Sequence, residues 1–282
     1  ILGGGAAGVG IAQLLRTALL AEGRTIEETL QAIAIIDSHG LLVDDAPIED
    51  LHKRPFAWPA ALAASRGLPP GRRGLMEVVG TFRPTVLIGA SGQPGIFDEA
   101  VIRSLAAGVD RPVVMPLSNP TSKSEAVPAD VLAWSDGRAL IATGSPFDPV
   151  ERDGRQIRIG QANNAFIFPG IGLGTITGRA RMVTDSMFLA AAHALAAQVK
   201  EEDLAAGSLY PRVRDLRAVT ALVAEAVVRE SRESCVGLPY EDAAIPRAVA
   251  RHMWEPAYPE LVAADPGARP AVPPAALPAH FE

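Results

Sequence analysis

The glycine pattern that opens the sequence constrains the fold more than any other feature of this chain. Gly3, Gly5 and Gly8 match the spacing G-x-G-x-x-G, and an apolar run over residues 9–20 predicts the helix that should follow. In a dinucleotide-binding loop the first glycine makes a tight turn, the second admits a pyrophosphate, and the third lets the helix pack closely on its strand. The N-terminus of that helix faces the phosphate charge. The pattern therefore predicts a nucleotide site, although glycine-rich turns also occur in loops without a ligand.

Such a loop normally follows a complete buried strand, whereas here only Ile1 and Leu2 precede it. The sequence also has no initiator methionine. We therefore expect this chain to be the C-terminal part of a longer protein.

Composition narrows the class of protein. The 282 residues, 48% hydrophobic and only 5% aromatic, suffice for a large α/β core. A net charge of −6 offers no basic surface for nucleic acid. The single Cys235 excludes a disulfide framework and fits a reducing compartment. No uncharged apolar run approaches the ~20 residues of a membrane span. We expect a cytoplasmic protein with neither nucleic acid nor membrane as a partner.

Short apolar runs alternate with helical patterns along the first part of the chain. Uninterrupted apolar runs are typical of strands that are buried on both faces. The predicted strands are residues 32–36, 84–89, 112–117 and 139–143, and the predicted helices between them are residues 75–81, 98–107 and 129–135. This alternation predicts an α/β fold, a Rossmann-like doubly wound parallel sheet whose ligands gather at the carboxyl ends of the strands.

The pattern changes after residue 168. A helix of small residues begins near residue 169, and long amphipathic helices are predicted over residues 184–200 and 213–234. We therefore predict one domain over residues 1–263, in which additional C-terminal helices follow the sheet. Residues 264–282 contain five prolines and little apolar periodicity, which predicts a disordered tail.

Several polar residues are candidates for a site. Asp37 ends the second predicted strand, where an acid can accept hydrogen bonds from an adenosine ribose, or it is simply a turn residue. The cations Lys53 and Arg54 follow it and are either solvated or placed to meet a ribose 2′-phosphate. The adjacent amides Asn163 and Asn164 suit recognition of a carboxylate without added charge, or form an Asx turn. The histidines show no metal-ligand spacing, so we assign no metal ligand.

Five motifs in order carry a resemblance to a known family. They are Leu2-Gly3-Gly4-Gly5-Ala6-Ala7-Gly8-Val9-Gly10-Ile11-Ala12, Ile36-Asp37-Ser38-His39-Gly40-Leu41-Leu42-Val43, Leu117-Ser118-Asn119-Pro120-Thr121, Thr143-Gly144-Ser145-Pro146-Phe147-Asp148-Pro149-Val150 and Gly160-Gln161-Ala162-Asn163-Asn164-Ala165-Phe166-Ile167-Phe168-Pro169-Gly170. Together they resemble the NAD(P)-binding half of malic enzyme over roughly residues 1–263.

The resemblance implies oxidative decarboxylation of L-malate to pyruvate and CO₂, with reduction of NAD(P) and a divalent metal, Mg²⁺ or Mn²⁺. In that family the metal ligands, the catalytic lysine and the catalytic tyrosine precede the glycine loop. We therefore assign no catalytic residue to this chain and expect it to bind dinucleotide without turnover. A missing N-terminal domain is an implied partner, and we expect a homo-oligomer.

The resemblance also implies roles for particular residues. The dinucleotide would be held by Gly3, Gly5, Ala6, Ala7, Gly8, Asp37, Ser38, Arg54, Ser91, Gly92 and Asn119. Asn119, Asn163 and Asn164 would line the region of nicotinamide and malate. The family loop usually carries an acid near Ala6, which this chain lacks. Because Ser38 and the cation Arg54 follow Asp37, as in the NADP-using members, we expect NADP in preference to NAD.

Three other hypotheses fit parts of the sequence. Another Rossmann-type dehydrogenase would share the glycine fingerprint but would not be expected to carry both the Asn119 and the Asn163-Asn164 motifs. A non-catalytic nucleotide-sensing module would explain the absence of catalytic groups. A malic-enzyme-like domain fused to an acyltransferase partner is the third.

Overall fold

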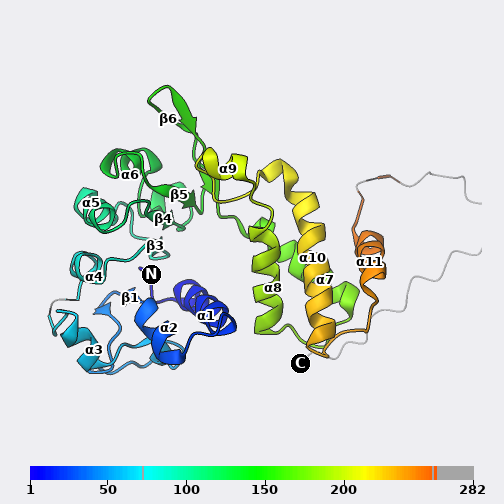
Figure 1. Ribbon diagram of the computed structural model, residues 1–282, viewed down its shortest axis with the longest axis horizontal. Coiled ribbons are helices and arrows are strands. Elements are labelled where there is room, and N and C mark those ends of the chain that lie inside the picture. Colours follow the sequence, from blue (N-terminus) through cyan, green and yellow to red (C-terminus); the bar gives the residue numbers. More distant parts are fainter. Residues whose placement is uncertain (72, 256, 259–282) are drawn as a thin grey trace, which may run out of the picture.

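A parallel sheet forms the centre of the first part of the molecule. The computed structural model describes residues 1–71, 73–255 and 257–258, so the predicted domain limit at residue 263 and the predicted tail lie outside the described residues. The sheet contains β3 (Val86–Gly89), β4 (Val113–Pro116), β5 (Leu140–Thr143) and β8 (Gly160–Gln161), in that spatial order and all parallel. The predicted Rossmann-like α/β fold is thereby confirmed (Figure 1).

The segment that precedes the glycine loop lies between two strands. Leu2 forms parallel bridges with Ile36 on one side and Gly89 on the other, which places it between β1 (Ile36–Asp37) and β3. β1 then turns back into the antiparallel β2 (Gly40–Leu41). The strand predicted over residues 32–36 is therefore shorter and begins later than expected. Residue 32 instead ends helix α2 (Ile26–Ala32), so the strand can start only after it.

Amphipathic helices connect and cover these strands. They are α1 (Ala6–Ala21), α2 (Ile26–Ala32), α3 (Ala60–Ser65), α4 (Leu75–Phe82), α5 (Glu99–Gly108) and α6 (Pro128–Trp134). Short 3₁₀ turns add η1 (Arg54–Phe56), η2 (Thr121–Lys123), η3 (Asn164–Phe166), η4 (Val213–Asp215) and η5 (Asp242–Ala244). The faces that these helices bury join the strands in one apolar core, which includes Trp58, Phe97, Ile102, Leu105, Leu132 and Ile141.

A two-stranded hairpin interrupts the path from β5 to β8. It consists of β6 (Val150–Arg152) and β7 (Arg155–Ile157), and it projects from the body of the molecule (Figure 1). Asp153 and Gly154 form the turn with φ values of +52° and +70°. Positive φ at both central residues is the geometry that suits the twist of a two-residue hairpin, and Asp-Gly adopts it readily.

The second part of the molecule is helical. It contains α7 (Phe168–Gly178), α8 (Asp185–Ala196), α9 (Glu201–Ala205), α10 (Leu216–Glu233) and α11 (Ile245–His252). The side chain of Thr184 caps α8 by accepting from the amide of Met187, as its position before the apolar pattern suggests. α8 matches the helix predicted over residues 184–200 but ends earlier. α10 matches the helix predicted over residues 213–234 but begins later. Residues 201–205 form the separate helix α9 instead.

Glycines allow α7 to lie directly against α10. A Cβ atom added at Gly174 would lie 2.6 Å from Cβ of Val227 and 2.7 Å from the carbonyl oxygen of Ala224. At Gly170 an added Cβ would lie 2.5 Å from a methyl carbon of Val223. Because such distances are far inside van der Waals contact, only glycine permits this separation of the two helices. The contact forms a second apolar core, separate from that of the sheet.

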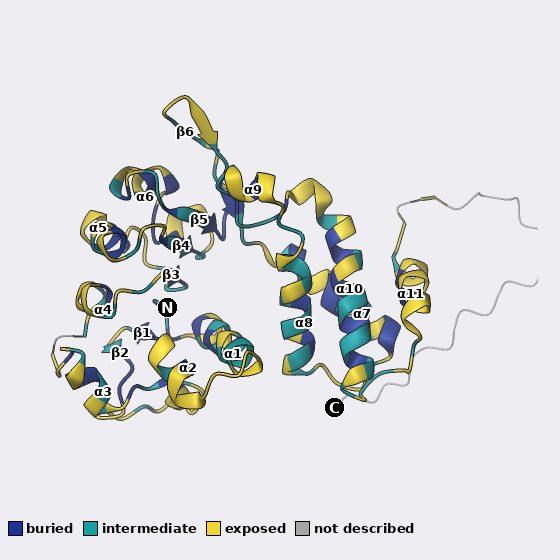
Figure 2. Ribbon diagram, viewed as in Figure 1, coloured by how far each residue is buried: buried dark blue, intermediate teal, exposed yellow. Residues whose placement is uncertain are grey.

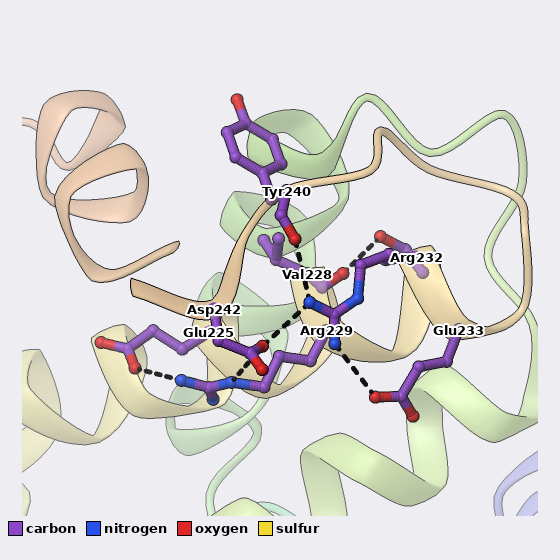
Figure 3. A network of polar contacts seen from close by, with 8 residues as sticks. Glu225, Val228, Arg229, Arg232, Glu233, Tyr240 and Asp242 are labelled. Carbon is purple, nitrogen blue, oxygen red and sulfur yellow. Dashed lines mark hydrogen bonds and ion pairs between the residues drawn. The ribbon is translucent and has the colours of Figure 1, made fainter. Parts of the chain in front are cut away.

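An ion-pair network fastens the end of α10 to the loop that follows it (Figure 3). Arg232 donates to the carbonyl of Tyr240 at 2.9 Å and to Asp242 at 2.9 Å. Arg229 pairs with Glu225 at 3.2 Å and lies 3.8 Å from Asp242. Because both arginines are paired with acidic side chains, we assign this cluster a structural role, in which it holds the segment before α11 against α10.

Burial follows these two cores (Figure 2). The inner faces of α8 and α10 and the strands of the sheet are buried, while α2, α11 and the hairpin are largely exposed. Within the described part of the chain, none of the helices combines the length and apolar composition needed to cross a bilayer.

Candidate nucleotide-binding site

Loops from neighbouring strands meet at one edge of the parallel sheet. The carboxyl ends of parallel strands face the same way, so the loops that follow them converge. The converging segments are residues 3–8 after Leu2, 37–39 after β1, 90–92 after β3, 117–119 after β4, 143–145 after β5 and 162–164 after β8. The predicted site residues other than Arg54 all lie on these segments.

The three glycines of the fingerprint have different physical reasons to be glycine. Gly3 has a φ of +121°, and a Cβ there would lie 2.4 Å from the carbonyl oxygen of Ala90. A Cβ at Gly8 would lie 1.8 Å from the carbonyl oxygen of Gly3. Gly5, in contrast, has a φ of −80° and no atom within 4 Å of its added Cβ. Gly3 and Gly8 therefore shape the loop, whereas Gly5 keeps open space beside it.

That open space faces the start of α1. Gly5 is the N-cap residue of α1, Ala6 and Ala7 are exposed in its first turn, and the first turn contains no acidic residue. The free backbone amides of a helix N-terminus attract an anion, and no acid of the first turn competes for them. The N-terminus of α1 is therefore not neutralised by an acid of its own first turn.

Asp37 lies against the glycine loop. A Cβ at Gly4 would lie 2.8 Å from Cβ of Asp37 and 3.3 Å from Nζ of Lys53. The Asp37 carboxylate accepts from the amide of His39 at 2.8 Å and from Nζ of Lys53 at 2.9 Å. Partial burial acts to raise the pKa of Asp37, but the hydrogen bond and charge of Lys53, together with the His39 amide, outweigh it and lower that pKa. Asp37 is thus an ionised acceptor beside the loop.

Of the two cations that follow Asp37, Lys53 contacts it. Nζ of Lys53 pairs with the Asp37 carboxylate, whereas Nε of Arg54 donates to the carbonyl of Ile48 at 2.9 Å. Arg54 lies in the 3₁₀ turn η1 and is exposed, and its contact with a dinucleotide stays a prediction. Ser38 is exposed, and its hydroxyl lies 3.3 Å from Nδ1 of His39.

A cleft of about 1280 Å³ opens beside Asp37. Its lining includes Asp37, Ser38, Lys53 and Arg73, but not Asn119. Arg73 is held in the wall by a bidentate ion pair with Asp45 at 2.7 and 2.8 Å. The cleft therefore belongs to the Asp37 side of the glycine loop, away from the loops after β4, β5 and β8.

Glu125 organises the loops after β3 and β4, and the sequence analysis missed it. Its side chain is fully buried and accepts hydrogen bonds from the backbone amides of Ser91, Gly92 and Ser118 and from both serine hydroxyls. A Cβ at Gly89 would lie 2.6 Å from its carboxyl carbon, so the strand must pass it as glycine. Glu125 ends the polar run Ser-Lys-Ser-Glu, which is typical of a solvated turn, and no local pattern predicts its burial.

The predicted amides lie on the same edge but are held differently. Oδ1 of Asn119 accepts from the buried hydroxyl of Ser145 at 2.5 Å, and its NH₂ group donates to the carbonyl of Leu117 at 3.4 Å. Oδ1 of Asn163 accepts from the amide of Ala165 at 2.9 Å and so caps η3, as an Asx turn does. Asn164 lines an apolar pocket of about 450 Å³ that also includes Leu14 of α1 and Phe188 of α8. Asn119 is thus joined to the loop after β5, whereas Asn164 opens toward the helical part.

Metal coordination has no basis in the described residues. Within the ranges 1–71, 73–255 and 257–258, no group of three or more His, Cys, Asp or Glu residues is placed to hold a metal ion.

The fold and the glycine loop with its neighbouring acid define a Rossmann-like dinucleotide-binding domain. Residues 1–232 match the family described as malic enzyme, NAD binding domain, and the chain belongs to that family. It is 40% identical over 257 residues to the NAD-dependent malic enzyme of Shewanella frigidimarina (strain NCIMB 400), which covers 91% of this chain and 46% of that protein. It is 44% identical over 260 residues to NAD-dependent malic enzyme 3 of Bacillus subtilis (strain 168), covering 92% of this chain and 46% of that protein. The chain thus spans about half the length of the curated relatives it matches.

Solved structures share the fold. The crystal structure of Entamoeba histolytica malic enzyme superposes with a TM-score of 0.64 at 21% identity, covering 89% of this chain and 46% of that one. The malic enzyme of Pyrococcus horikoshii Ot3 gives a TM-score of 0.59 at 24% identity, over 87% of this chain and 57% of that one.

Proposed function

We propose that this chain is the dinucleotide-binding part of an NAD-dependent malic enzyme, which converts L-malate to pyruvate and CO₂. Membership of the family supports this, as do two relatives that are named NAD-dependent malic enzymes. The observation that carries the proposal is the open space beside Gly5 at the N-terminus of α1, next to Gly4, which lies against Asp37.

The geometry suggests how the dinucleotide is held. The pyrophosphate lies at Gly5 and at the exposed backbone of Ala6 and Ala7, while Asp37 accepts hydrogen bonds from the adenosine ribose. The nicotinamide half then extends to the opposite side of the glycine loop, over the loops after β3 and β4. When bound, NAD supplies the hydride acceptor for C2 of malate.

Two or more amides orient the substrate in this proposal. Asn119 is exposed, and its NH₂ group donates one proton to the carbonyl of Leu117, which leaves the second for a carboxylate of malate or the nicotinamide amide. Either Asn163 or Asn164 assists it, and the capping bond of Asn163 leaves its own NH₂ group available. In this proposal the metal ligands and the proton-transfer groups come from the part of the enzyme that precedes the glycine loop, as the resemblance to the family implies.

The contacts favour NAD, although the sequence led us to expect NADP. Lys53 is already paired with Asp37, and Arg54 donates to a backbone carbonyl. A 2′-phosphate would add about −1.5 to −2 charges beside the Asp37 carboxylate, whose contacting lysine is already paired with it. A ribose 2′-hydroxyl, in contrast, can donate to Asp37.

Calorimetric titration of the chain with NADH and NADPH tests the binding part of the proposal. We expect tighter binding of NADH, and we expect Asp37→Asn to weaken NADH about tenfold, because it loses a hydrogen bond to a charged acceptor worth about 1.5–3 kcal/mol. Asp203→Asn is the matched control, because Asp203 is an ion-paired acid whose partners lie outside the site. Tighter binding of NADPH would contradict the choice of NAD, and failure to bind either dinucleotide would contradict the proposed function.

A turnover assay tests whether catalysis needs the part of the enzyme that this chain does not match. The chain alone with malate and Mn²⁺ should reduce no measurable NAD, since turnover near the ~1–10³ s⁻¹ of ordinary enzymes needs the groups that the resemblance places before the glycine loop. Joined to the unmatched part of the Bacillus subtilis relative, the chain should gain malate-dependent reduction of NAD. A homo-oligomeric state and a cytoplasmic location stay predictions, and sedimentation would test the first.

A further inference from the structure

Glu125 joins the two loops over which the nicotinamide half of the dinucleotide would lie. Its Oε1 atom accepts from the amide of Ser91 at 2.8 Å and from the hydroxyls of Ser91 at 2.9 Å and Ser118 at 2.5 Å. The amides of Gly92 and Ser118 approach the same carboxylate at 3.3 Å. Because every partner is an uncharged donor, the set matches a carboxylate, which only accepts.

The cluster also decides what the two serines can offer to a ligand. A serine hydroxyl has a single proton, and both serines donate theirs to Glu125. The hydroxyl of Ser91 further accepts from the amide of Gln93 at 3.2 Å, and that of Ser118 accepts from the amide of Gly92 at 2.9 Å. Each partly exposed hydroxyl is left with one lone pair and no proton. Toward the site, both serines are therefore acceptors.

The order of the strands identifies the part of the dinucleotide that meets these acceptors. Residues 1–3 lie between β1 and β3, so the glycine loop separates Asp37 on one side from Ser91 and Ser118 on the other. With the adenosine ribose at Asp37 and the pyrophosphate at Gly5, the nicotinamide riboside lies over the two serines. Its ribose hydroxyls and its carboxamide NH₂ group are hydrogen-bond donors, whereas phosphate oxygens are acceptors only.

We propose that Glu125 is a positioning residue that fixes the hydroxyls of Ser91 and Ser118 as acceptors for a donor group of the nicotinamide riboside. The inference rests on the proposed function and deepens it. The buried carboxylate touches no ligand itself. It acts by taking up the serine protons, so that this wall of the site accepts nicotinamide riboside and repels a phosphate.

Calorimetric titration of the 282-residue chain with NADH, ADP-ribose and ADP tests the assignment. Glu125→Gln replaces one acceptor oxygen by an NH₂ donor among five donors, which should release or reverse the serine hydroxyls. We expect it to raise the Kd of NADH at least about tenfold, which corresponds to ~1.4 kcal/mol. The Kd of ADP, which lacks the nicotinamide riboside, should stay within about twofold. Asp203→Asn, an equally conservative change of another buried acid, should leave all three Kd values unchanged.

The ligands separate the possible donors. A weaker binding of both NADH and ADP-ribose assigns the acceptors to the ribose hydroxyls, and a weaker binding of NADH alone assigns them to the carboxamide. If Glu125→Gln does not fold, Ser118→Ala and Ser91→Ala remove one acceptor each and should show the same selective loss. Unchanged NADH binding, or an equal loss for ADP, would overturn the inference while the proposed function stands. A wild-type chain that does not bind NADH would overturn both.

Discussion

Substitutions at Gly5, Gly8 and Gly10 provide a test that separates the shape of the loop from ligand binding. Gly5→Ala places a methyl group in open space, because no described atom lies within 4 Å of the added carbon. As an N-cap residue, Gly5 tolerates alanine at a cost of about 1 kcal/mol or less in the free energy of unfolding. With a pyrophosphate bound, however, the same methyl group occupies the ligand's volume, and crowding of this kind costs about 1–3 kcal/mol. We expect the Kd of NADH to rise about tenfold or more.

Gly8→Ala and Gly10→Ala are the two controls for this result, one for loss of stability and one for a substitution without effect on binding. At Gly8 the added carbon would lie 1.8 Å from a backbone oxygen, so Gly8→Ala should lower the free energy of unfolding by about 3 kcal/mol or more. Gly10 lies in α1 with nothing within 4 Å of its added carbon, and alanine there should stabilise the chain by about 0.5–1 kcal/mol. NADH binding should be unaffected by Gly10→Ala.

Urea unfolding followed by circular dichroism measures stability, and calorimetry on the folded protein measures the affinity for NADH. The reasoning predicts a loss of affinity without instability for Gly5→Ala alone. It would be refuted by a Gly5→Ala chain that binds NADH as tightly as the wild type, or by a loss of affinity in Gly10→Ala of the same size.

Three further predictions concern the rest of the chain. Gly174→Ala should destabilise the contact of α7 with α10 by about 1–3 kcal/mol, whereas Gly172→Ala, whose added carbon meets nothing within 4 Å, should be neutral or stabilising in urea unfolding. The hydrogen bond from Arg158 lowers the pKa of Asp203. The pair therefore stabilises the fold above about pH 4, and this stabilisation is lost as the pH falls and Asp203 takes up a proton. Asp203→Asn should show a smaller difference between the urea midpoints at pH 7 and pH 3 than the wild type does. In the chimera with the Bacillus subtilis relative, Asn119→Ala should lower kcat/KM for malate about tenfold or more, and an unchanged value would remove Asn119 from the substrate site.

The sequence predicted those parts of the fold that have a periodic apolar signal. The runs at residues 84–89, 112–117 and 139–143 became β3, β4 and β5, in which most residues are buried or partly buried. The polar stretch around residues 22–31 was not predicted to be helical, yet it contains α2. Thr25 and Glu28 form a capping box there, a signal that is present in the sequence but weaker than apolar periodicity.

The part of the candidate site that one loop forms could be predicted from the sequence. The parts that need contacts between distant loops could not. The spacing of Gly3, Gly5 and Gly8 is local, so the loop followed from the sequence. The pairing of Asp37 with Lys53 depends on the path of the intervening 15 residues, and a cation one position later is indistinguishable by pattern. The role of Glu125 depends on its burial against the loops after β3 and β4, and no local sequence pattern predicts that burial.

The hairpin of β6 and β7 offers a place to modify the chain without disturbing the sheet. Its turn, Asp153-Gly154, is exposed, and the hairpin projects from the body of the molecule (Figure 1). Exposed turns of this kind accept inserted peptides and new termini, because no buried backbone hydrogen bond has to be broken. An epitope, a fluorophore or a circularly permuted end at this turn should therefore leave both cores intact. The hairpin also leads directly into β8 and the segment at residues 162–164, so a probe there would report movements of that edge when a ligand binds.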